Sequence, residues 1–353
     1  MTETTLKIEI YDLVAPINHL NLYKAIVSSL SSFSHLVIYT RQGYFQNEFQ
    51  GNKNIEIRIL EENKQSNNRL IRLFRNVKQI YRIKNIFNTQ KNSKIILTFD
   101  TSSFAFSLLL LKLRNTYIMH HKNIDELSSI IKRVCFKMYM NKVKHIVFED
   151  LFSEKLLSVG VKKDNLLLVP HPISNQSSII LSHKYELVGL SNSNDEIFIE
   201  NLILFESKNS FFRNKKMKVV IRSKNKEYDN GYLKVFKGQL SIDVYNEFIG
   251  LSKSILLPLP KNFIYRVSGT MFDAFSRGKY VFSNANTLTE YYENKYPGII
   301  STFDSIEEFY RKIDMDFSTN TLSFERFVSD HSLVKINECF RNEFGEKNEH
   351  KKK

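Results

Sequence analysis

Short runs of β-branched and aromatic residues alternate with helical patterns along the whole sequence. Six such runs fall in the first half, at 7–11, 36–40, 55–60, 95–99, 116–120 and 145–148. The alternation starts again at residue 185 and continues towards the end of the chain. Strands that are separated by helices form βαβ units, in which the strands are parallel. The sequence therefore predicts an α/β fold.

The length of the chain predicts more than one domain. A chain of 353 residues is too long for one ordinary hydrophobic core. We expect an N-terminal domain at 1–172, a linker at 173–184 and a second α/β domain at 185–320. A last helix near 322–343 and a charged tail fill 321–353. Two such domains imply a cleft, and ligands of parallel sheets bind beyond the carboxyl ends of the strands.

Cysteine use and hydropathy indicate the compartment. The two cysteines cannot form a disulfide framework, which favours a reducing environment. The first residues lack the pattern of a signal peptide. The longest apolar run, Phe104–Leu113, is too short to cross a membrane and is predicted to be a core helix. We expect a cytoplasmic protein.

Positive charge is concentrated in the first half. The chain has a net charge of +14, and the first 176 residues alone carry +11. The segment 64–94 has nine basic residues and no acidic one, and its apolar residues recur at helical spacing. If this helix contacts a membrane or an acceptor, the basic residues that make the contact are expected to be Arg69, Arg72, Arg75, Lys78 and Arg82.

Three interpretations of the basic helix stay open. It packs on a sheet with a solvated cationic face, it docks on an anionic membrane or a lipid-phosphate acceptor, or it binds nucleic acid. The sequence has no helix-turn-helix, zinc-finger or RNA-recognition motif, so we expect no nucleic acid.

The most informative segment is Tyr265–Val281, which follows the apolar run Ile255–Leu257 and a proline turn. Ser268-Gly269-Thr270 begins a helix there. A helix start offers N–H groups and positive dipole, and glycine lets a phosphate approach the backbone. Asp273 lies one turn further, where a carboxylate can reach ribose hydroxyls. A capped helix without a ligand is the alternative.

This order of an apolar strand, proline, Tyr-Arg-x-Ser-Gly-Thr, an acid-bearing helix and Gly-Lys resembles the C-terminal half of GT-B glycosyltransferases. The resemblance is to the group 1, glycogen-synthase-like enzymes that build bacterial surface polysaccharides, and it covers nearly the whole chain. These enzymes carry two glutamates eight positions apart, where this chain has Tyr265 and Asp273. The resemblance implies two Rossmann-like domains facing across a cleft and a C-terminal helix that crosses back to the first domain.

The resemblance also implies a UDP- or GDP-sugar donor on the second domain, with no separate cofactor. A small-residue loop after Val188 would approach the diphosphate, and Arg222 or Lys224 would offset its charge. An ordinary strand-to-helix turn and solvated cations are the alternatives. The expected donor-binding residues are Gly189, Ser191, Asn192, Arg222, Lys224, Tyr265, Arg266, Ser268, Gly269, Thr270 and Asp273.

Polar residues that follow strands of the first domain are candidates for the acceptor side. They are His19, Asp100, His120 and His121. A histidine or carboxylate at such a position can act as a general base or orient the acceptor sugar, and a structural role is the alternative for each. The histidines show no zinc spacing, and we expect no metal site.

We therefore predict a metal-independent hexosyltransferase that moves a sugar to a lipid-linked or oligosaccharide acceptor, in capsule, exopolysaccharide or O-antigen synthesis. The pathway follows from the resemblance alone. The basic helix would hold the protein at the inner face of the cell membrane. A GT-B-like accessory subunit without activity and, with less support, a nucleic-acid-binding protein remain as alternatives. The sequence does not indicate an oligomeric state.

Overall fold

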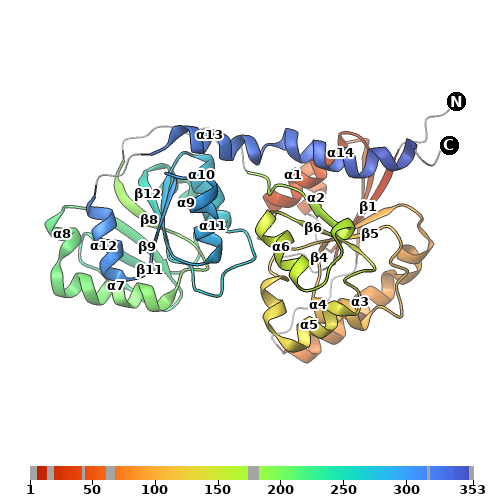
Figure 1. Ribbon diagram of the computed structural model, residues 1–353, viewed down its shortest axis with the longest axis horizontal. Coiled ribbons are helices and arrows are strands. Elements are labelled where there is room, and N and C mark those ends of the chain that lie inside the picture. Colours follow the sequence, from red (N-terminus) through yellow and green to blue (C-terminus); the bar gives the residue numbers. More distant parts are fainter. Residues whose placement is uncertain are drawn as a thin grey trace. The chain divides into compact units, whose positions relative to one another are not determined.

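The computed structural model describes residues 6–13, 20–41, 44–60, 68–173, 183–315 and 319–349. The chain divides into two compact units (Figure 1). Unit 1 comprises residues 1–172 and 331–353, and unit 2 comprises residues 173–330. His19 and most of the predicted linker 173–184 lie outside the described residues.

Unit 1 is built on a parallel sheet in the order β3-β2-β1-β4-β5-β6-β7. Its strands are β1 (Lys7–Asp12), β2 (His35–Thr40), β3 (Ile55–Ile59), β4 (Ser93–Thr98), β5 (Thr116–Met119), β6 (Lys144–Val147) and β7 (Leu166–Leu168). Its helices are α1 (Leu20–Ser31), α2 (Tyr44–Phe49), α3 (Arg69–Thr89), α4 (Thr101–Phe106), α5 (Ile130–Lys137), α6 (Asp150–Ser158) and α14 (Leu333–Glu349). Short 3₁₀ turns lie at Asp125–Ser128 and Lys163–Asn165.

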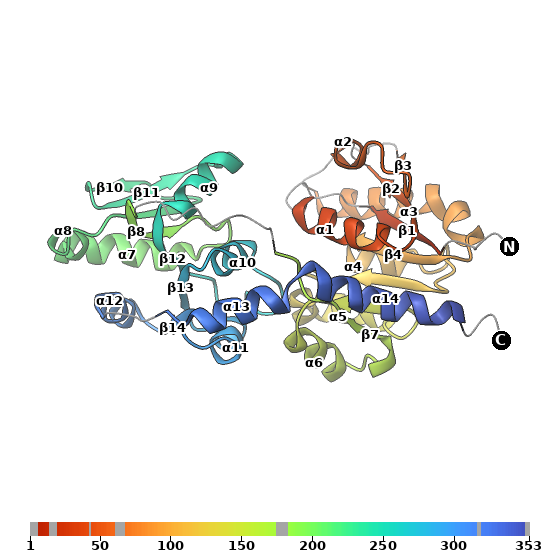
Figure 2. The ribbon, with the colours of Figure 1, turned by 90° about the horizontal axis from the view of Figure 1, so that it is seen from above.

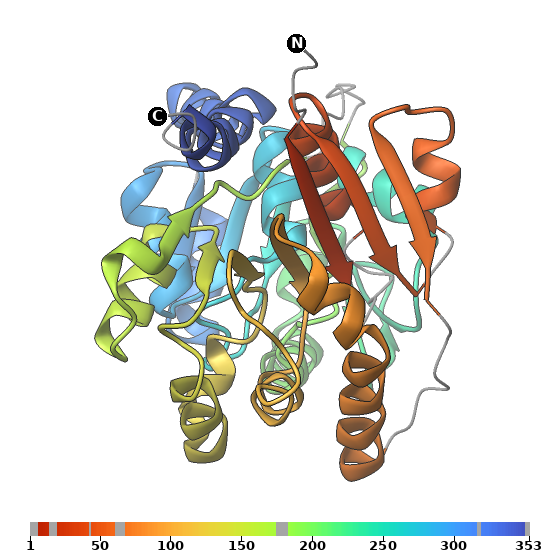
Figure 3. The same ribbon diagram turned by 90° about the vertical axis from the view of Figure 1, so that its right-hand side faces the viewer.

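Helices cover both faces of this sheet (Figure 3). On one face Tyr11 of β1 packs against Phe87 of α3. On the other face α1 lies against α14, and Tyr117 of β5 packs on Phe344 of α14. Two covered faces explain why the strands are apolar on both sides, as parallel sheets require.

The helix α14 returns to unit 1 from the far end of the chain. Glu343 accepts a hydrogen bond from Tyr117 and forms an ion pair with Lys144 at 2.7 Å. Ser29 of α1 donates a hydrogen bond to Asn337. The final helix is thus an integral part of the N-terminal sheet unit.

Unit 2 has a second sheet in the order β10-β11-β9-β8-β12-β13-β14, parallel except for the β10–β11 pair. Its strands are β8 (Tyr185–Gly189), β9 (Val219–Ser223), β10 (Tyr228–Asp229), β11 (Leu233–Lys237), β12 (Ser252–Leu257), β13 (Tyr280–Asn284) and β14 (Ile300–Phe303). Its helices are α7 (Glu196–Asn209), α8 (Phe211–Asn214), α9 (Ile242–Gly250), α10 (Gly269–Ser276), α11 (Thr287–Lys295), α12 (Ile306–Asp314) and α13 (Thr321–Asp330).

The core of unit 2 joins α7 and α12 to one face of its sheet (Figure 2). Phe198 of α7 packs on Phe309 of α12, and both belong to a buried cluster with Val219 and Leu256. Helices α9 and α10 contact β12 of the same sheet. Both units are therefore α/β with helix-covered parallel sheets, which confirms the predicted fold class.

The sequence predicts one continuous C-terminal helix, and this prediction is wrong. The structure divides it into α13 and α14 at His331. The His331 side chain is buried, and its Nδ1 lies 3.0 Å from the His171 carbonyl oxygen and its Nε2 3.6 Å from Glu149. Ser332 then accepts a hydrogen bond from the Lys335 N–H and begins α14. Periodicity continues across such a break because both helices are amphipathic.

One further helix prediction is corrected in unit 1, and a second helix, α3, is buried over only part of its length. The run Phe104–Leu113 is no single core helix, because α4 ends at Phe106 and Leu109 is 99% exposed. In α3 only the C-terminal half reaches the sheet, through Ile80, Ile83 and Phe87. The Leu70 and Phe74 side chains, which belong to the apolar repeat of this helix, are 75% and 72% exposed.

We expect Glu343→Gln to lower the free energy of unfolding of unit 1 by about 1–2 kcal/mol. The substitution removes one charge of a half-buried ion pair and weakens a hydrogen bond to Tyr117. Urea unfolding followed by circular dichroism measures the change. The exposed Glu338 of the same helix provides the matched control, Glu338→Gln, which should change stability by less than about 0.5 kcal/mol. Equal effects of the two substitutions would contradict the prediction.

Candidate functional site

At the carboxyl edge of the unit 2 sheet, a topological switch point lies between β8 and β12. Strand β8 pairs with β9 on one side and with β12 on the other. The chain proceeds from β8 through α7 to β9, and from β12 through α10 to β13, so the two connections diverge here. Ligands of parallel α/β sheets bind at such a switch point. The predicted donor loops, 190–195 and 258–268, are the loops that follow these two strands.

Asn194 fixes the loop after β8. Its buried side-chain amide donates to the carbonyl oxygens of Gly189 and Arg222, at 3.0 Å each. The Asp195 N–H donates to the Pro258 carbonyl oxygen at 2.6 Å, and the Asp195 carboxylate caps α7. One short segment thus fastens the ends of β8 and β9 and the loop after β12. The sequence analysis did not include Asn194.

The predicted loop residues have different roles in the structure. A side chain at Gly189 would lie 2.8 Å from the Leu256 carbonyl oxygen, so the glycine is required by the close approach of β12. Ser191 is buried and accepts a hydrogen bond from the Ser193 N–H within the turn. Asn192 is exposed at the tip of the turn. Of the three, Asn192 has the side chain that is accessible to a ligand.

Arg222 is the basic residue of β9. It lies at the carboxyl end of β9, half-buried, and Gly189 is in register with the preceding residue, Ile221. Burial lowers the pKa of Arg222, although a guanidinium remains charged at neutral pH. Within the described part of the chain its side chain has no hydrogen bond or ion pair. A partly desolvated guanidinium without a counter-ion favours an anionic ligand.

Lys224 follows on the same segment, and its role in the fold is carried by its backbone. Its N–H donates to the Glu196 carboxylate at 2.8 Å, while Ser223 Oγ donates to the same carboxylate at 2.6 Å. The Lys224 side chain is exposed. Glu196, in the first turn of α7, therefore holds the segment after β9 in place.

The start of α10 has the predicted cap. Ser268 is buried, and its Oγ accepts a hydrogen bond from the Met271 N–H at 3.4 Å. The first helical backbone bond runs from the Phe272 N–H to the Ser268 carbonyl oxygen. Gly269 is exposed, and a side chain built on it would meet open space. The N–H groups of the first turn are thus presented at an accessible helix start, where positive dipole accumulates.

Asp273 and Thr270 contact a residue that the sequence analysis missed. Tyr245 of α9 donates a hydrogen bond to the Asp273 carboxylate at 3.0 Å and also bonds Thr270. Burial raises the pKa of Tyr245, and the neighbouring carboxylate adds to the effect. Tyr245 thus remains a neutral donor that orients Asp273. A tyrosine in the amphipathic α9 gives no signal of this contact in the sequence.

Tyr265 and Arg266 lie on the loop between β12 and α10, and both are half-buried. The Arg266 guanidinium is stacked 4.2 Å from the centre of the Phe263 ring. Its position is therefore set by a cation–π contact within its own loop.

On the carboxyl edge of unit 1, His121 lies in a polar cluster. The Tyr23 hydroxyl of α1 is 3.2 Å from His121 Nε2 and also bonds Thr98 at the end of β4. Burial raises the pKa of Tyr23, so its phenol stays protonated. Strands β1 and β4 are neighbours at the switch point of this sheet. His121 is half-buried and remains a candidate for the acceptor side.

His120 is corrected from a candidate base to a core residue. It is 1% exposed, and its Nε2 lies 2.8 Å from His145 Nδ1. His145 Nε2 in turn contacts the Met140 carbonyl oxygen at 2.7 Å, so Nε2 of His145 is the donor and Nδ1 the acceptor. Burial lowers the pKa of His120 well below its ordinary value, and His145 contributes. A neutral histidine inside the core does not reach an acceptor.

Asp100 is also corrected. It caps α4 by accepting hydrogen bonds from the Ser103 N–H and hydroxyl, and it forms an ion pair with Lys132 at 2.6 Å. Burial alone would raise the pKa of Asp100, but the Lys132 and Ser103 bonds outweigh it and hold the pKa below its usual range. A carboxylate stabilised in this way is a weak base, and its role is structural. His19, the remaining candidate, lies outside the described residues.

Within the described ranges, histidine, cysteine, aspartate and glutamate nowhere gather in a group of three that could hold a metal ion. None of the helices in the described part of the chain combines the length and apolar character needed to cross a bilayer.

Known proteins are matched by structure and not by sequence. No family model matches the chain, and no curated protein matches it by sequence. HepE from Anabaena, solved with UDP and glucose, superposes with a TM-score of 0.64 over 97% of this chain and 99% of its own, at 11% identity. The chain has the GT-B fold.

Two further GT-B structures agree over the whole length. Sucrose-phosphate synthase from Thermosynechococcus elongatus gives a TM-score of 0.58, with 96% of this chain and 95% of its own covered at 12% identity. AviGT4, a glycosyltransferase involved in avilamycin A biosynthesis, gives 0.57 over 96% and 97% at 8% identity. The fold predicted from the Tyr265–Val281 segment is therefore confirmed.

We expect acidification to destabilise unit 1 through the histidine pair. Burial lowers the pKa of His145 to about 4, against about 6.5 in the unfolded chain. Between these values the unfolded state binds the proton and the folded state does not, so stability falls as pH decreases from about 6.5 to about 4. The loss attributable to His145 is about 3 kcal/mol.

Urea unfolding of the wild type and of His145→Gln across this pH range measures the effect. The substitution lowers stability at neutral pH and should flatten the pH dependence. The exposed His183 gives the control His183→Gln, which should keep the wild-type slope. A slope that His145→Gln leaves unchanged would show that the pair does not titrate in this way.

Proposed function

We propose that this GT-B protein is a glycosyltransferase that takes its sugar from a nucleotide-diphosphate sugar bound at the carboxyl edge of unit 2. The observation that carries the proposal is the presence of two features suited to an anion at the same carboxyl edge of the unit 2 sheet. They are the half-buried Arg222 at the carboxyl end of β9, for which the described residues provide no ion pair, and the accessible helix start at Ser268–Thr270 after β12. HepE, which shares the fold, was solved with UDP and with UDP-glucose, so UDP is the first nucleotide to test.

The proposed donor contacts follow from charge and hydrogen-bonding capacity. The diphosphate would accept hydrogen bonds from the first N–H groups of α10 and from the Arg222 guanidinium. These groups would also stabilise the charge that develops on the departing nucleoside diphosphate. Asp273, oriented by Tyr245, is the proposed partner of ribose or sugar hydroxyls. Asn192, Lys224, Tyr265 and Arg266 are proposed to border this site.

The acceptor is proposed to be a sugar on a lipid diphosphate or an oligosaccharide, bound by unit 1. His121 is the proposed acceptor-side residue, because Tyr23 holds it at the carboxyl edge of the unit 1 sheet and it retains partial exposure. In its neutral form an imidazole nitrogen can accept the proton of an attacking hydroxyl or orient that hydroxyl. A place in the synthesis of a surface polysaccharide fits this acceptor class.

We expect UDP to raise the unfolding temperature of the wild type and not that of Gly269→Val. At a hundred times its Kd a ligand stabilises the folded state by about 2.7 kcal/mol. A side chain at Gly269 meets no protein atom within 4 Å, so the valine variant should fold and block only the approach of the phosphate. A thermal-shift panel with UDP, GDP, CMP, dTDP and ADP makes the measurement.

Arg222→Gln should weaken nucleotide binding about ten- to a hundred-fold, because a charge-assisted hydrogen bond is worth roughly 1.5–3 kcal/mol. The exposed Arg213 of unit 2 provides the control Arg213→Gln, which should keep the wild-type Kd. Absence of a shift with every nucleotide, or an equal shift in Gly269→Val, would refute the donor site. Binding without sugar transfer would instead favour the accessory-subunit alternative.

We expect His121→Gln to reduce turnover at least a hundred-fold with nucleotide affinity unchanged, since general base catalysis contributes roughly 10²–10⁴. Release of the nucleoside diphosphate from the sugar donor that the panel identifies provides the assay. Tyr23→Phe should cause a smaller loss, because it keeps the His121 imidazole and removes the hydroxyl that bonds His121 and Thr98. The exposed His183 again serves as control. Full turnover in His121→Gln would remove the residue from the mechanism.

A further inference from the structure

Unit 1 exposes large apolar side chains on three neighbouring helices. Helix α3 contacts α4, and α4 contacts α5, so the three lie along one side of the unit (Figures 1 and 3). The exposed apolar side chains of these helices and of the turn after α4 include Leu70, Phe74, Phe106, Leu109, Ile130 and Val134. We name these six residues, with the exposed cations Lys78, Arg82 and Lys137, the α3–α5 face. Monomeric soluble proteins rarely leave such a set of side chains without a partner.

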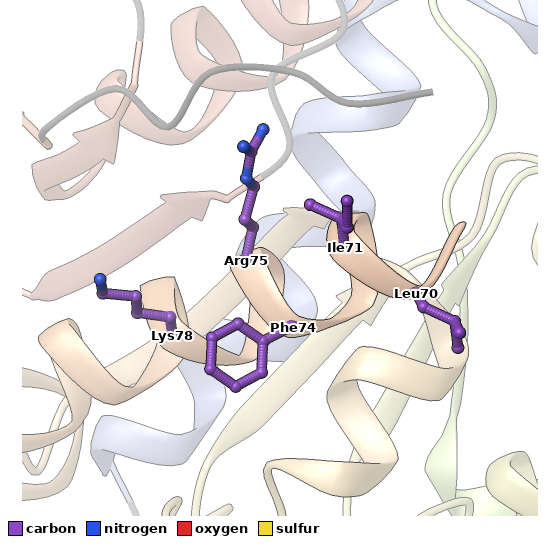
Figure 4. Close-up of a pocket in the computed structure, with 5 residues that line it drawn as sticks. All are labelled: Leu70, Ile71, Phe74, Arg75 and Lys78. Atoms are coloured by element: carbon purple, nitrogen blue, oxygen red, sulfur yellow. The ribbon is translucent and has the colours of Figure 1, made fainter. Parts of the chain in front are cut away.

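The apolar residues of this face are arranged at helical spacing. Leu70 and Phe74 are four positions apart on α3, and Ile130 and Val134 are four apart on α5, so each pair projects from one side of its helix. Leu70, Ile71, Phe74, Arg75 and Lys78 of α3 line a shallow groove, which therefore has three apolar and two cationic side chains (Figure 4). Leu109 projects from the turn that follows α4 and is almost fully exposed.

The charge of the α3–α5 face has one sign. None of the three helices contains an acidic residue. Counted over the sequence, unit 1 carries a net charge of +13 and unit 2 a net charge of +1. A second copy of this face would therefore bring cations against cations, which disfavours self-association. Nucleic acid would use the cations and leave the exposed leucine, isoleucine and valine side chains in water.

An anionic bilayer fits both properties of the face. We propose that the α3–α5 face docks unit 1 on a membrane that contains anionic lipid. Phe74, Leu109 and Ile130 enter the boundary between headgroups and acyl chains, and Lys78, Arg82 and Lys137 contact the lipid phosphates. Helices that lie in a bilayer interface have this combination of apolar side chains and cations at low overall hydrophobicity.

The inference deepens the proposed function and rests on it for its purpose. A transferase that acts on a lipid-linked sugar gains from residence at the surface where that acceptor lies, because the search becomes two-dimensional. The contacts with lipid involve none of the proposed donor residues, which all belong to unit 2. Docking and donor binding can therefore be tested separately on the full chain.

Flotation with vesicles of neutral phosphatidylcholine, and of phosphatidylcholine mixed with phosphatidylglycerol, provides the experiment. The wild type should float with the anionic vesicles only, and less as salt is raised. The substitutions Lys78→Gln and Arg82→Gln should each lower the partition coefficient about five-fold, since a cation near such a surface contributes about 1 kcal/mol. Phe74→Ser and Ile130→Ser should each lower it about ten-fold.

Matched control variants come from unit 2. Leu204, exposed on α7, gives Leu204→Ser, and the exposed lysines Lys208 and Lys234 give Lys208→Gln and Lys234→Gln. These variants should float like the wild type. Circular dichroism and the nucleotide thermal shift establish that each variant is folded.

Several outcomes would overturn the docking surface. They are equal flotation with neutral and anionic vesicles, equal losses in the unit 2 controls, a dimer that Phe74→Ser dissociates, or salt-dependent RNA binding without flotation. A nucleotide shift without flotation would refute this surface and leave the donor site standing. Flotation without any nucleotide shift would support the surface and refute the proposed function.

Discussion

The close contact between β8 and β12 determines where the candidate donor site opens. Position 189 lies so close to the Leu256 carbonyl oxygen that only glycine fits there. This approach joins β8 and β12 at their carboxyl ends. The chain connections that follow β8 and β12 diverge, so the pairing of these two strands places a topological switch point between them. Asn194 and Asp195 then bind the loop after β8 to both neighbours. The cap at Ser268 and Arg222 lie at the carboxyl ends of the strands that this framework joins, and both belong to the proposed donor site.

The features that could be predicted from the sequence are those that depend on neighbouring residues. The alternation of strands and helices and the cap at Ser268 are local, and both are present in the structure. The roles of Asp100 and His120 depend on Lys132 and His145, which lie 32 and 25 positions away and reach them only by tertiary packing. Asn192 and Asn194 are equivalent in a turn sequence, and sheet register decides which side chain is buried. The exposure of Leu109 could not be foreseen because an apolar run predicts burial.

The two units differ in how they can attract an anion. Unit 2 is almost neutral, so attraction there depends on a few oriented groups, namely a helix start and one half-buried guanidinium. Such groups act over short distances and discriminate by geometry. Unit 1 carries nearly all of the net charge and spreads it over long, solvated side chains, which act over about a Debye length and discriminate little. The first arrangement suits a small ligand of fixed shape, and the second suits a fluid surface.

The return of α14 to unit 1 has a consequence for the synthesis of the chain on the ribosome. Unit 1 lacks Glu343 and Phe344, which cover Tyr117 and Lys144, until the last residues are translated. Unit 2 is continuous in sequence and is complete as soon as residue 330 has emerged. Domains generally fold as units in the order of their synthesis, and contacts across a long sequence separation form slowly. Here the middle of the chain can mature first, while the nascent N-terminal sheet waits with an uncovered apolar flank that is a natural substrate for chaperones.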